Sequence, residues 1–244
     1  MDKFTHTEDG RITRRGSLVK LGGILAAALA AGGWKADSSE SASGATTAGA
    51  GPAGVASGAV KCVLAPEQTE GPYYISNEKV RRNITEGRPG ASLTLRLAVV
   101  DASTCKPIKG AAVDIWHCDA GGVYSGFGQG SGNRTFLRGI QKTDAKGIAT
   151  FQTVYPGWYP GRTVHIHVKV HLGGNVVHTG QLYFPDTLTD SLYQKAPYRN
   201  RPGRDTRNAN DRVYFNGGKN SMLSVRRSGA AGYVGTITMG VQRS

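Results

Sequence analysis

The chain has 244 residues, of which 39% are hydrophobic, and its formal net charge is +13. This length and apolar content allow one domain with a sizeable core. The charge alone would suit a nucleic-acid partner, but the sequence has no helix-turn-helix pattern, zinc-finger spacing or stacked aromatic motif, so we expect no nucleic acid and interpret the charge as attraction for anionic substrates or surfaces.

The first part of the chain has the composition of an export signal. Residues 11–33 combine the pair Arg14-Arg15 with a short run rich in Ala, Gly and Leu, and the paired arginines indicate the twin-arginine route. We therefore predict a signal at residues 1–36 and a periplasmic or extracellular protein. The apolar run is shorter than the roughly 20 residues that span a membrane, so no stable anchor is expected after signal removal. Residues 37–60, mainly Ser, Ala, Gly and Thr, are predicted to be a disordered linker.

The folded domain is expected to occupy residues 61–244, and it contains all three cysteines. A disulfide is permitted outside the cytoplasm. Cys62 and Cys105 lie in predicted loops, so we predict a bridge between them. Cys118 shares the strand parity of Trp116 and is expected to be buried and free.

Alternating apolar and polar residues predict strands along this domain. Segments 136–143 and 147–153 are expected to pair through the Asp- and Gly-containing turn between them. Short strands, regular turn signals and the lack of a long amphipathic helix predict an all-β sandwich of mixed or antiparallel strands with long loops. The predicted strands are 92–101, 111–118, 136–143, 147–153, 163–170, 176–184, 213–215 and 233–241, with weak helical character at 186–198.

A predicted strand near the middle of the chain carries His165 and His167 on one of two differently solvated faces. Neighbouring side chains on one face start about 6.5–7 Å apart, so two imidazoles can bind one ion. The preceding segment 156–162 is rich in Pro and Gly and is expected to be a loop that brings Tyr159 and Arg162 close to the histidines. Two packed histidines without a metal are the alternative that this spacing leaves open.

Tyrosine as a ligand favours a particular kind of metal. A phenol loses its proton only near pH 10 unless a strongly charged cation stabilises the phenolate, and ferric iron is such a cation. Zinc and copper prefer His, Cys or carboxylate ligands, and a three-histidine site that recruits His171 or His178 remains an alternative. A non-catalytic exported β-sandwich that binds sugars, aromatic compounds or metal is another.

Four motifs make the pattern more specific. In chain order they are TEGPYY at 69–74, VDIWHCDAGGVYS at 113–125, PGWYPGRTVHIH at 156–167 and GQLYFP at 180–185. With these motifs the chain resembles the intradiol ring-cleavage dioxygenases, the family of protocatechuate 3,4-dioxygenase and catechol 1,2-dioxygenase, and in particular their small secreted members.

The resemblance implies a non-haem Fe(III) enzyme. Such an enzyme uses O2 to cleave a catechol-type ring between its two hydroxyl-bearing carbons, which gives a cis,cis-muconate-type product. The resemblance further implies that Tyr159 acts as a base, that Arg162 stabilises negative charge and that Gln181 lies beside the oxygen-reaction pocket. The implied metal ligands are Tyr124, Tyr159, His165 and His167, and the implied substrate-pocket residues are Gly71, Pro72 and Tyr73.

Overall fold

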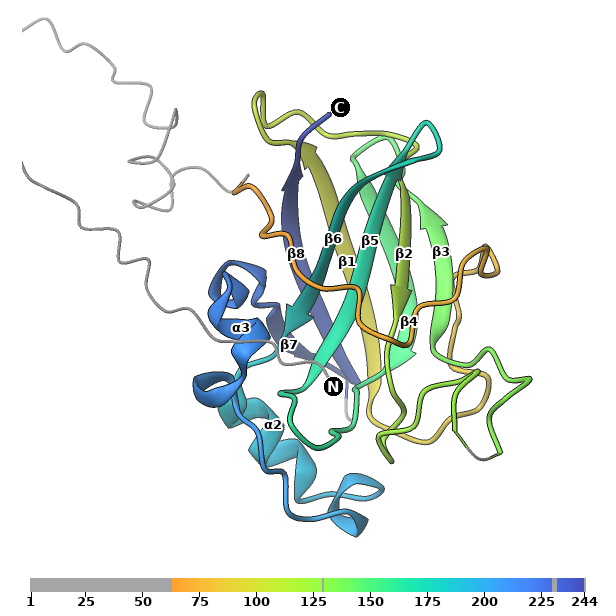
Figure 1. Cartoon of the computed structure of the whole chain (residues 1–244), viewed down its shortest axis with the longest axis vertical. Coiled ribbons are helices and arrows are strands. Elements are labelled where there is room, and N and C mark those ends of the chain that lie inside the picture. Colours follow the sequence, from red (N-terminus) through yellow and green to blue (C-terminus); the bar gives the residue numbers. More distant parts are fainter. Residues whose placement is uncertain (1–62, 129, 230–231, 244) are drawn as a thin grey trace, which may run out of the picture. The chain divides into compact units, whose positions relative to one another are not determined.

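The computed structural model describes residues 63–128, 130–229 and 232–243. This part of the chain forms two four-stranded sheets, with strand orders β4-β1-β8-β7 and β3-β2-β5-β6 (Figure 1). The predicted all-β sandwich is confirmed. The strands are β1 Ser92–Asp101, β2 Ala112–Trp116, β3 Arg138–Lys142, β4 Ile148–Val154, β5 His165–Leu172, β6 Asn175–Tyr183, β7 Ser224–Ser228 and β8 Gly232–Val241.

Short helices follow the second sheet. Helix α2 spans Asp186–Tyr193, where the sequence predicted weak helical character, and α3 spans Arg212–Phe215. Single 3₁₀ turns lie at Tyr198–Asn200, Asn208–Asn210 and Gly218–Ser221. None of the helices in the described residues is long and apolar enough to cross a membrane. The predicted signal at 1–36 and the predicted linker at 37–60 lie outside the described residues.

The core lies between the two sheets and follows the predicted alternation. In β1 the side chains of Leu93, Leu95 and Leu97 have no exposed surface, and Ile166 and Val168 of β5 are equally buried. Successive side chains of a strand point to opposite faces, so the apolar face of β5 packs into the core. His165, His167 and Lys169 therefore point to the other face of the sheet.

That outer face of β5 is also buried, so the prediction of two differently solvated faces is wrong. His165 and His167 are only 2% and 1% exposed. The segment that leads into β1 crosses this face of the sheet (orange in Figure 1). It is bonded to β6 through the backbone N–H of Gln68, which donates to the backbone carbonyl of Thr179 at 2.9 Å. The histidines thus lie in a water-poor layer between the sheet and this crossing segment.

The predicted pairing of 136–143 with 147–153 is also wrong, although both strands exist. β3 pairs with β2, whereas β4 pairs with β1 in the other sheet. The turn between β3 and β4 begins at Thr143, which lies beside the segment leading into β2. The Thr143 hydroxyl donates to the Ile108 carbonyl and accepts from the Ala111 backbone amide. The Val99 amide of β1 donates to the Gly147 carbonyl at the other end. The turn therefore crosses between sheets.

Two further differences concern the C-terminal part of the domain. Residues 213–215 form helix α3 instead of a strand, because the Asp211 carboxylate accepts the amides of Val213 and Tyr214 and so caps the helix. Strand β7 was not predicted. It is an edge strand whose sequence, SVRRS, is mostly exposed and shows no apolar alternation.

Two of the three cysteines, Cys105 and Cys118, lie in the described residues. Cys105 is disulfide-bonded. Cys118 is free and 1% exposed. The predicted partner of Cys105, Cys62, lies outside the described residues.

An ionisable side chain is buried on the outer face of β2. Asp114 is 1% exposed, and its carboxyl oxygens make no hydrogen bond of good geometry among the described residues, although the Tyr74 hydroxyl interacts with them. Burial is the main cause that raises its pKa to about 7. The folded protein therefore holds this proton more tightly than the unfolded chain, whose Asp has a pKa of about 4. Stability should fall as the pH rises from about 4 to 7, and stay reduced above that.

We therefore expect Asp114→Asn to raise the free energy of unfolding of the metal-free protein by about 1–3 kcal/mol at pH 8, and by much less at pH 4.5. Urea unfolding at the two pH values measures this difference. Asp144 is the control, because amide donors, first that of Ile148, lower the pKa of its exposed carboxylate. Asp144→Asn should destabilise at pH 8. An Asp114→Asn protein that is less stable than the wild type at pH 8 would contradict the assignment.

Candidate metal centre

Strand register brings the candidate residues together. Trp116 of β2, His167 of β5 and Gln181 of β6 lie opposite one another, so their side chains form one row on the outer face of the sheet. The neighbouring row pairs His165 with Tyr183. All of these residues except Trp116 and Tyr183 were candidate site residues from the sequence, and the sheet now explains why they meet.

The two histidines face each other through the nitrogens that would bind a metal. Nε2 of His165 lies 3.1 Å from Nε2 of His167. The other nitrogen of His165, Nδ1, is 2.6 Å from the Thr163 carbonyl and donates to it, so Nε2 of His165 carries a lone pair. The His167 ring stacks on Trp116, with centroids 4.8 Å apart and planes at 6°, which fixes its orientation.

Both imidazoles are neutral at ordinary pH. Burial is the main cause that lowers the pKa of His165 to about 3 and that of His167 well below its usual 6.5. A neutral imidazole is the form that binds a metal ion.

Two tyrosines from different loops complete the group. The Tyr159 hydroxyl lies 3.1 Å from Nε2 of His165. The Tyr124 ring is 5.7 Å from that of Tyr159 and 6.1 Å from that of His167. Tyr124 is 4% exposed, and its hydroxyl makes no hydrogen bond of good geometry among the described residues, although it interacts with the Tyr159 hydroxyl. Two phenol groups and two imidazoles therefore meet in one largely buried place.

Burial also affects the phenols. It raises the pKa of Tyr159 to about 12 and that of Tyr124 well above 10. Both side chains are therefore protonated at neutral pH unless a strong cation lies beside them. The arrangement can hold a hard trivalent ion, because such an ion stabilises both phenolates at once.

The loop that carries Tyr124 is held by a buried carboxylate. Asp119 accepts the amides of Gly121 and Val123 through Oδ1, at 2.8 and 3.0 Å, and it pairs with Arg88. A Cβ atom at Gly157 would approach the Asp119 carbonyl to 2.4 Å. The two loops that carry the tyrosines therefore pack backbone to backbone, and Gly157 permits this approach.

Arg162 is held on both sides of its guanidinium. Its Nε donates to Oδ2 of Asp211 at 2.9 Å, and its Nη2 donates to Oε1 of Gln181 at 2.5 Å. The Gln181 amide nitrogen in turn donates to the Thr69 carbonyl at 3.0 Å. Arg162 and Gln181, both predicted from the sequence, thus form one hydrogen-bonded unit next to the row of histidines.

The predicted substrate-pocket residues lie against the same group. The Tyr73 ring stacks on Tyr124 at 4.4 Å and meets Tyr159 edge-on at 6.2 Å. Gly71 lies so close to His167 that an added Cβ would be 3.2 Å from its Cε1. Pro72, between them in the chain, is exposed.

The three-histidine alternative finds no support in the described residues. No group of three or more His, Cys, Asp or Glu side chains there could hold a metal ion. His178 is used elsewhere, since its Nδ1 lies 2.8 Å from the Glu67 carboxylate.

Comparisons with known proteins identify the family of this chain. The family described as Dioxygenase matches residues 69–198. An intradiol ring-cleavage dioxygenase from Tetranychus urticae is 39% identical, with a TM-score of 0.71 over 74% of this chain and 95% of that one. The chain belongs to the intradiol ring-cleavage dioxygenase family.

Two other members extend the comparison. The dioxygenase domain of a dioxygenase and carbohydrate-binding protein fusion from Streptomyces sp. SirexAA-E is 33% identical, with a TM-score of 0.58 over 75% of this chain and all of that one. Catechol 1,2-dioxygenase from Candida albicans is 27% identical over 148 residues, which are 50% of this chain and 49% of that enzyme. The match thus spans about half the length of the Candida enzyme.

Two buried residues of this family member were not identified from the sequence. Asp211 follows Asn210 in a loop that the sequence presents only as basic and Asn-rich, and its link to Arg162 depends on the fold. Arg138 has no exposed surface, and it donates to the Tyr73 carbonyl at 2.6 Å and to the Ser125 hydroxyl at 2.9 Å. It therefore joins the pocket segment to the loop that carries Tyr124. For Asp211, the only sequence signal was that Asp is a common N-cap residue, here directly before helix α3.

We expect Gly71→Ala to weaken metal binding more than it weakens the fold. Gly71 has φ +73°, where an L residue costs about 1–2 kcal/mol, and its new methyl group would also press on His167. Gly87→Ala is the control, because Gly87 has φ +74° with nothing within 4 Å of the added Cβ. Thermal unfolding should shift similarly in the two variants, whereas iron affinity should fall in Gly71→Ala alone. Equal iron affinity in both variants would contradict the contact with His167.

Proposed function

We propose that this protein binds a non-haem ferric ion through Tyr124, Tyr159, His165 and His167 and uses O2 to cleave a catechol-type ring between its two hydroxyl-bearing carbons. The product is a cis,cis-muconate-type dicarboxylate. The observation that carries the proposal is the convergence of one buried phenol, one partly exposed phenol and two neutral imidazoles. The named catechol 1,2-dioxygenases among its relatives support the choice of substrate class.

The donor set fits ferric iron on chemical grounds. The buried Tyr124 hydroxyl makes no hydrogen bond of good geometry within the described chain, and Nε2 of His165, which carries a lone pair, lies 3.1 Å from Nε2 of His167. When bound, the ferric ion would supply a Lewis acid that stabilises the phenolates and a bound catecholate.

Among the four ligands, Tyr159 is suited to exchange a proton with the substrate. It is the only one of the four that is partly exposed, so a substrate can approach its oxygen. Its hydroxyl is hydrogen-bonded to His165, which positions it. A phenolate at this position can accept a proton from a catechol hydroxyl as general base.

Arg162 supplies the positive charge at the site. Its guanidinium is fixed by Asp211 and Gln181, so it does not need to reorganise as negative charge develops on the substrate. Preorganised charge in a water-poor site is worth much more than in bulk water. Tyr73, stacked on Tyr124, offers an aromatic wall against which a catechol ring can pack.

Oxygen uptake by the iron-loaded protein tests the proposal. A panel of catechol, substituted catechols and protocatechuate should include at least one compound that consumes O2 and gives the absorption of a cis,cis-muconate. The loaded protein should show the broad visible band of ferric tyrosinate. A colourless iron-replete protein, or a product opened beside the two hydroxyls, would overturn the proposal. Catechol binding without oxygen uptake would favour the non-catalytic β-sandwich.

We also propose that the protein is exported, because Arg14-Arg15 and the apolar run after them have the composition of a twin-arginine signal. Replacing both arginines by Lys should leave the protein in the cytoplasm, measured by cell fractionation. Undiminished export of the iron-loaded variant would contradict this route.

A further inference from the structure

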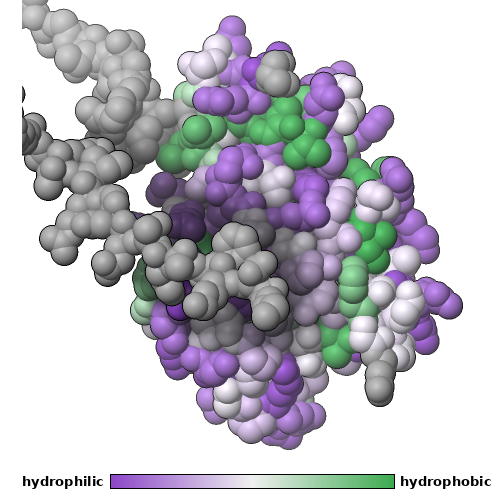
Figure 2. All heavy atoms as spheres, in the orientation of Figure 1, coloured by the Kyte–Doolittle hydropathy of each residue, from purple (hydrophilic) through white to green (hydrophobic). Residues whose placement is uncertain are grey.

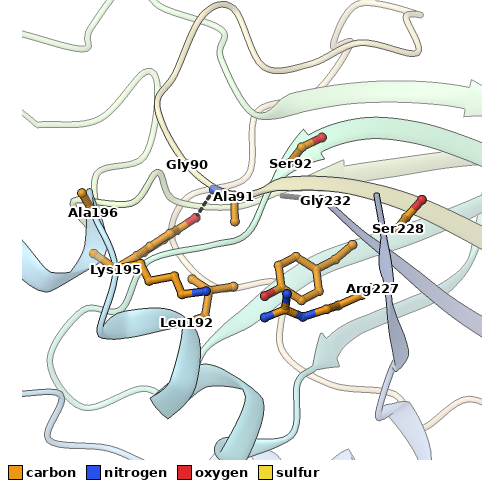
Figure 3. A pocket seen from close by; sticks show the side chains of 11 residues that line it. Gly90, Ala91, Ser92, Leu192, Lys195, Ala196, Arg227, Ser228 and Gly232 are labelled. Atoms are coloured by element: carbon orange, nitrogen blue, oxygen red, sulfur yellow. Dashed lines mark hydrogen bonds between the residues drawn. The ribbon is translucent and has the colours of Figure 1, made fainter. Parts of the chain in front are cut away.

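A cavity lies away from the candidate metal centre. It has a volume of about 530 Å³, within the range of small-molecule sites. Its walls come from the start of β1, the end of α2 with the following turn, the end of β7 and the start of β8 (Figure 3). None of the four proposed metal ligands lines it.

The base of this cavity is rigid and partly apolar. Leu192 and Tyr198 are 3% and 2% exposed. The Tyr198 hydroxyl donates to the Tyr155 carbonyl at 2.7 Å and accepts from the Ala91 amide at 3.0 Å. Tyr198 is therefore locked in place, and with half-buried Tyr233 it gives the cavity flat, apolar surfaces.

The charge of the cavity is positive. Lys195 and Arg227 line it, and no Asp or Glu does. In Figure 3 the side chains of both extend toward the same space. Within the described residues neither side chain has a hydrogen bond or an ion pair, whereas Arg204 in the neighbouring loop is paired with Asp186 and Asp190.

We propose that this cavity binds an organic carboxylate with a flat, unsaturated body of about one ring. Arg227 and Lys195 would hold the carboxylate, because a guanidinium or ammonium without an internal partner is available for a charge-assisted hydrogen bond. Tyr233 and Leu192 would pack against the flat body. The two positive side chains would repel a cationic ligand. They also disfavour a neutral hydrocarbon, because it would leave both charges without a partner.

Such a ligand has two possible sources. One is an aromatic acid, and the other is a ring-opened dicarboxylate, which rests on the proposed function. Benzoate and cis,cis-muconate are the corresponding probes, since neither has the paired hydroxyls of a catechol.

The experiment measures probe binding by calorimetry to the full chain, both metal-free and loaded with ferric iron. We expect saturable binding of at least one probe to both forms, with an unchanged visible band in the loaded form. Preference for benzoate identifies the aromatic acid as the source, and preference for muconate identifies the ring-opened product. Because the metal-free form suffices, failure of the iron chemistry would not affect this measurement.

Matched variants locate the binding. Arg227→Gln and Lys195→Gln should each weaken binding at least about tenfold. Arg226→Gln, at the adjacent exposed position of β7, and Lys219→Gln should leave it unchanged, since neither residue lines the cavity. Equal affinity in Arg227→Gln and the wild type, absence of saturable binding at millimolar probe, or binding only to the loaded form with a shifted visible band would each overturn the proposal.

Discussion

Tyr124→Phe is expected to remove the visible band of the iron-loaded protein and to lower kcat/KM at least about 10³-fold, which corresponds to about 4 kcal/mol of transition-state stabilisation. The substitution deletes one of four donor atoms and half of the phenolate charge that favours a ferric ion. Because the four donors act as one unit, the remaining three should not compensate.

The same change should do no harm to the metal-free fold. The Tyr124 hydroxyl is buried and makes no hydrogen bond of good geometry in the described chain, where it interacts only loosely with the Tyr159 hydroxyl, so removing it relieves a desolvation cost. We therefore expect the free energy of unfolding of the metal-free variant to be equal to that of the wild type or higher by about 1 kcal/mol. Iron content, visible absorption and urea unfolding together measure this separation of binding from stability.

Tyr74→Phe is the matched control. The Tyr74 ring packs on Trp116 at 4.8 Å, directly behind His167, but its hydroxyl is not one of the four donors. The visible absorption and the kcat/KM of the iron-loaded Tyr74→Phe protein should stay within about twofold of those of the wild type. An iron-replete Tyr124→Phe protein with normal colour would remove Tyr124 from the donor set and, with it, the dioxygenase chemistry proposed here.

Sequence periodicity predicted the parts of this fold that depend on one strand at a time. The alternation in β1 gave its buried face, and the spacing of His165 and His167 placed them side by side. The same periodicity could not show that a crossing segment also buries the outer face of β5. Burial there comes from residues about a hundred positions away in the chain, held by contacts such as that of Gln68 with Thr179.

Pairing between strands was less predictable than the strands themselves. The segment around Asp144 and Gly147 has the residues of a hairpin turn, and it does form a tight turn in which Asp144 accepts the Ile148 amide. Whether the following strand pairs with β3 or enters the other sheet depends on Thr143 and Val99, which bind opposite ends of the turn. Local turn chemistry therefore specified the reversal and left the partner undecided.

The described residues expose few large hydrophobic side chains. On the face shown in Figure 2, hydrophilic residues cover most of the area and hydrophobic residues form small separate groups. The exposed large hydrophobic side chains come from well-separated positions of the described chain, which are Leu64, Val80, Val123, Val176 and Phe215. Scattered exposed apolar residues are normal in soluble domains. The buried polar groups therefore say more about function than the exposed apolar ones. Asp211, which holds Arg162, is the most important of the buried groups that the sequence motifs did not include.

Asp211→Asn is expected to lower kcat/KM about 10–100-fold with the visible band of iron retained. Both carboxylate oxygens of Asp211 are saturated by donors. Oδ2 accepts from Nε of Arg162 and the Thr163 amide, and Oδ1 accepts from the amides of Val213 and Tyr214. An Asn must turn its NH₂ group toward one of these pairs, so Arg162 loses its partner or helix α3 loses its cap.

The loss should fall mainly on kcat, because Arg162 is proposed to act on charge that develops during the reaction and not on the metal ligands. Stability should fall by about 1–3 kcal/mol, below the 3–5 kcal/mol of a fully buried broken pair, since the Arg162 side chain is 18% exposed. Asp205→Asn is the control, because Asp205 accepts the Gly161 amide on the same loop without touching Arg162. Steady-state kinetics and urea unfolding of both variants measure the difference, and equal kcat in the two would show that Asp211 only caps the helix.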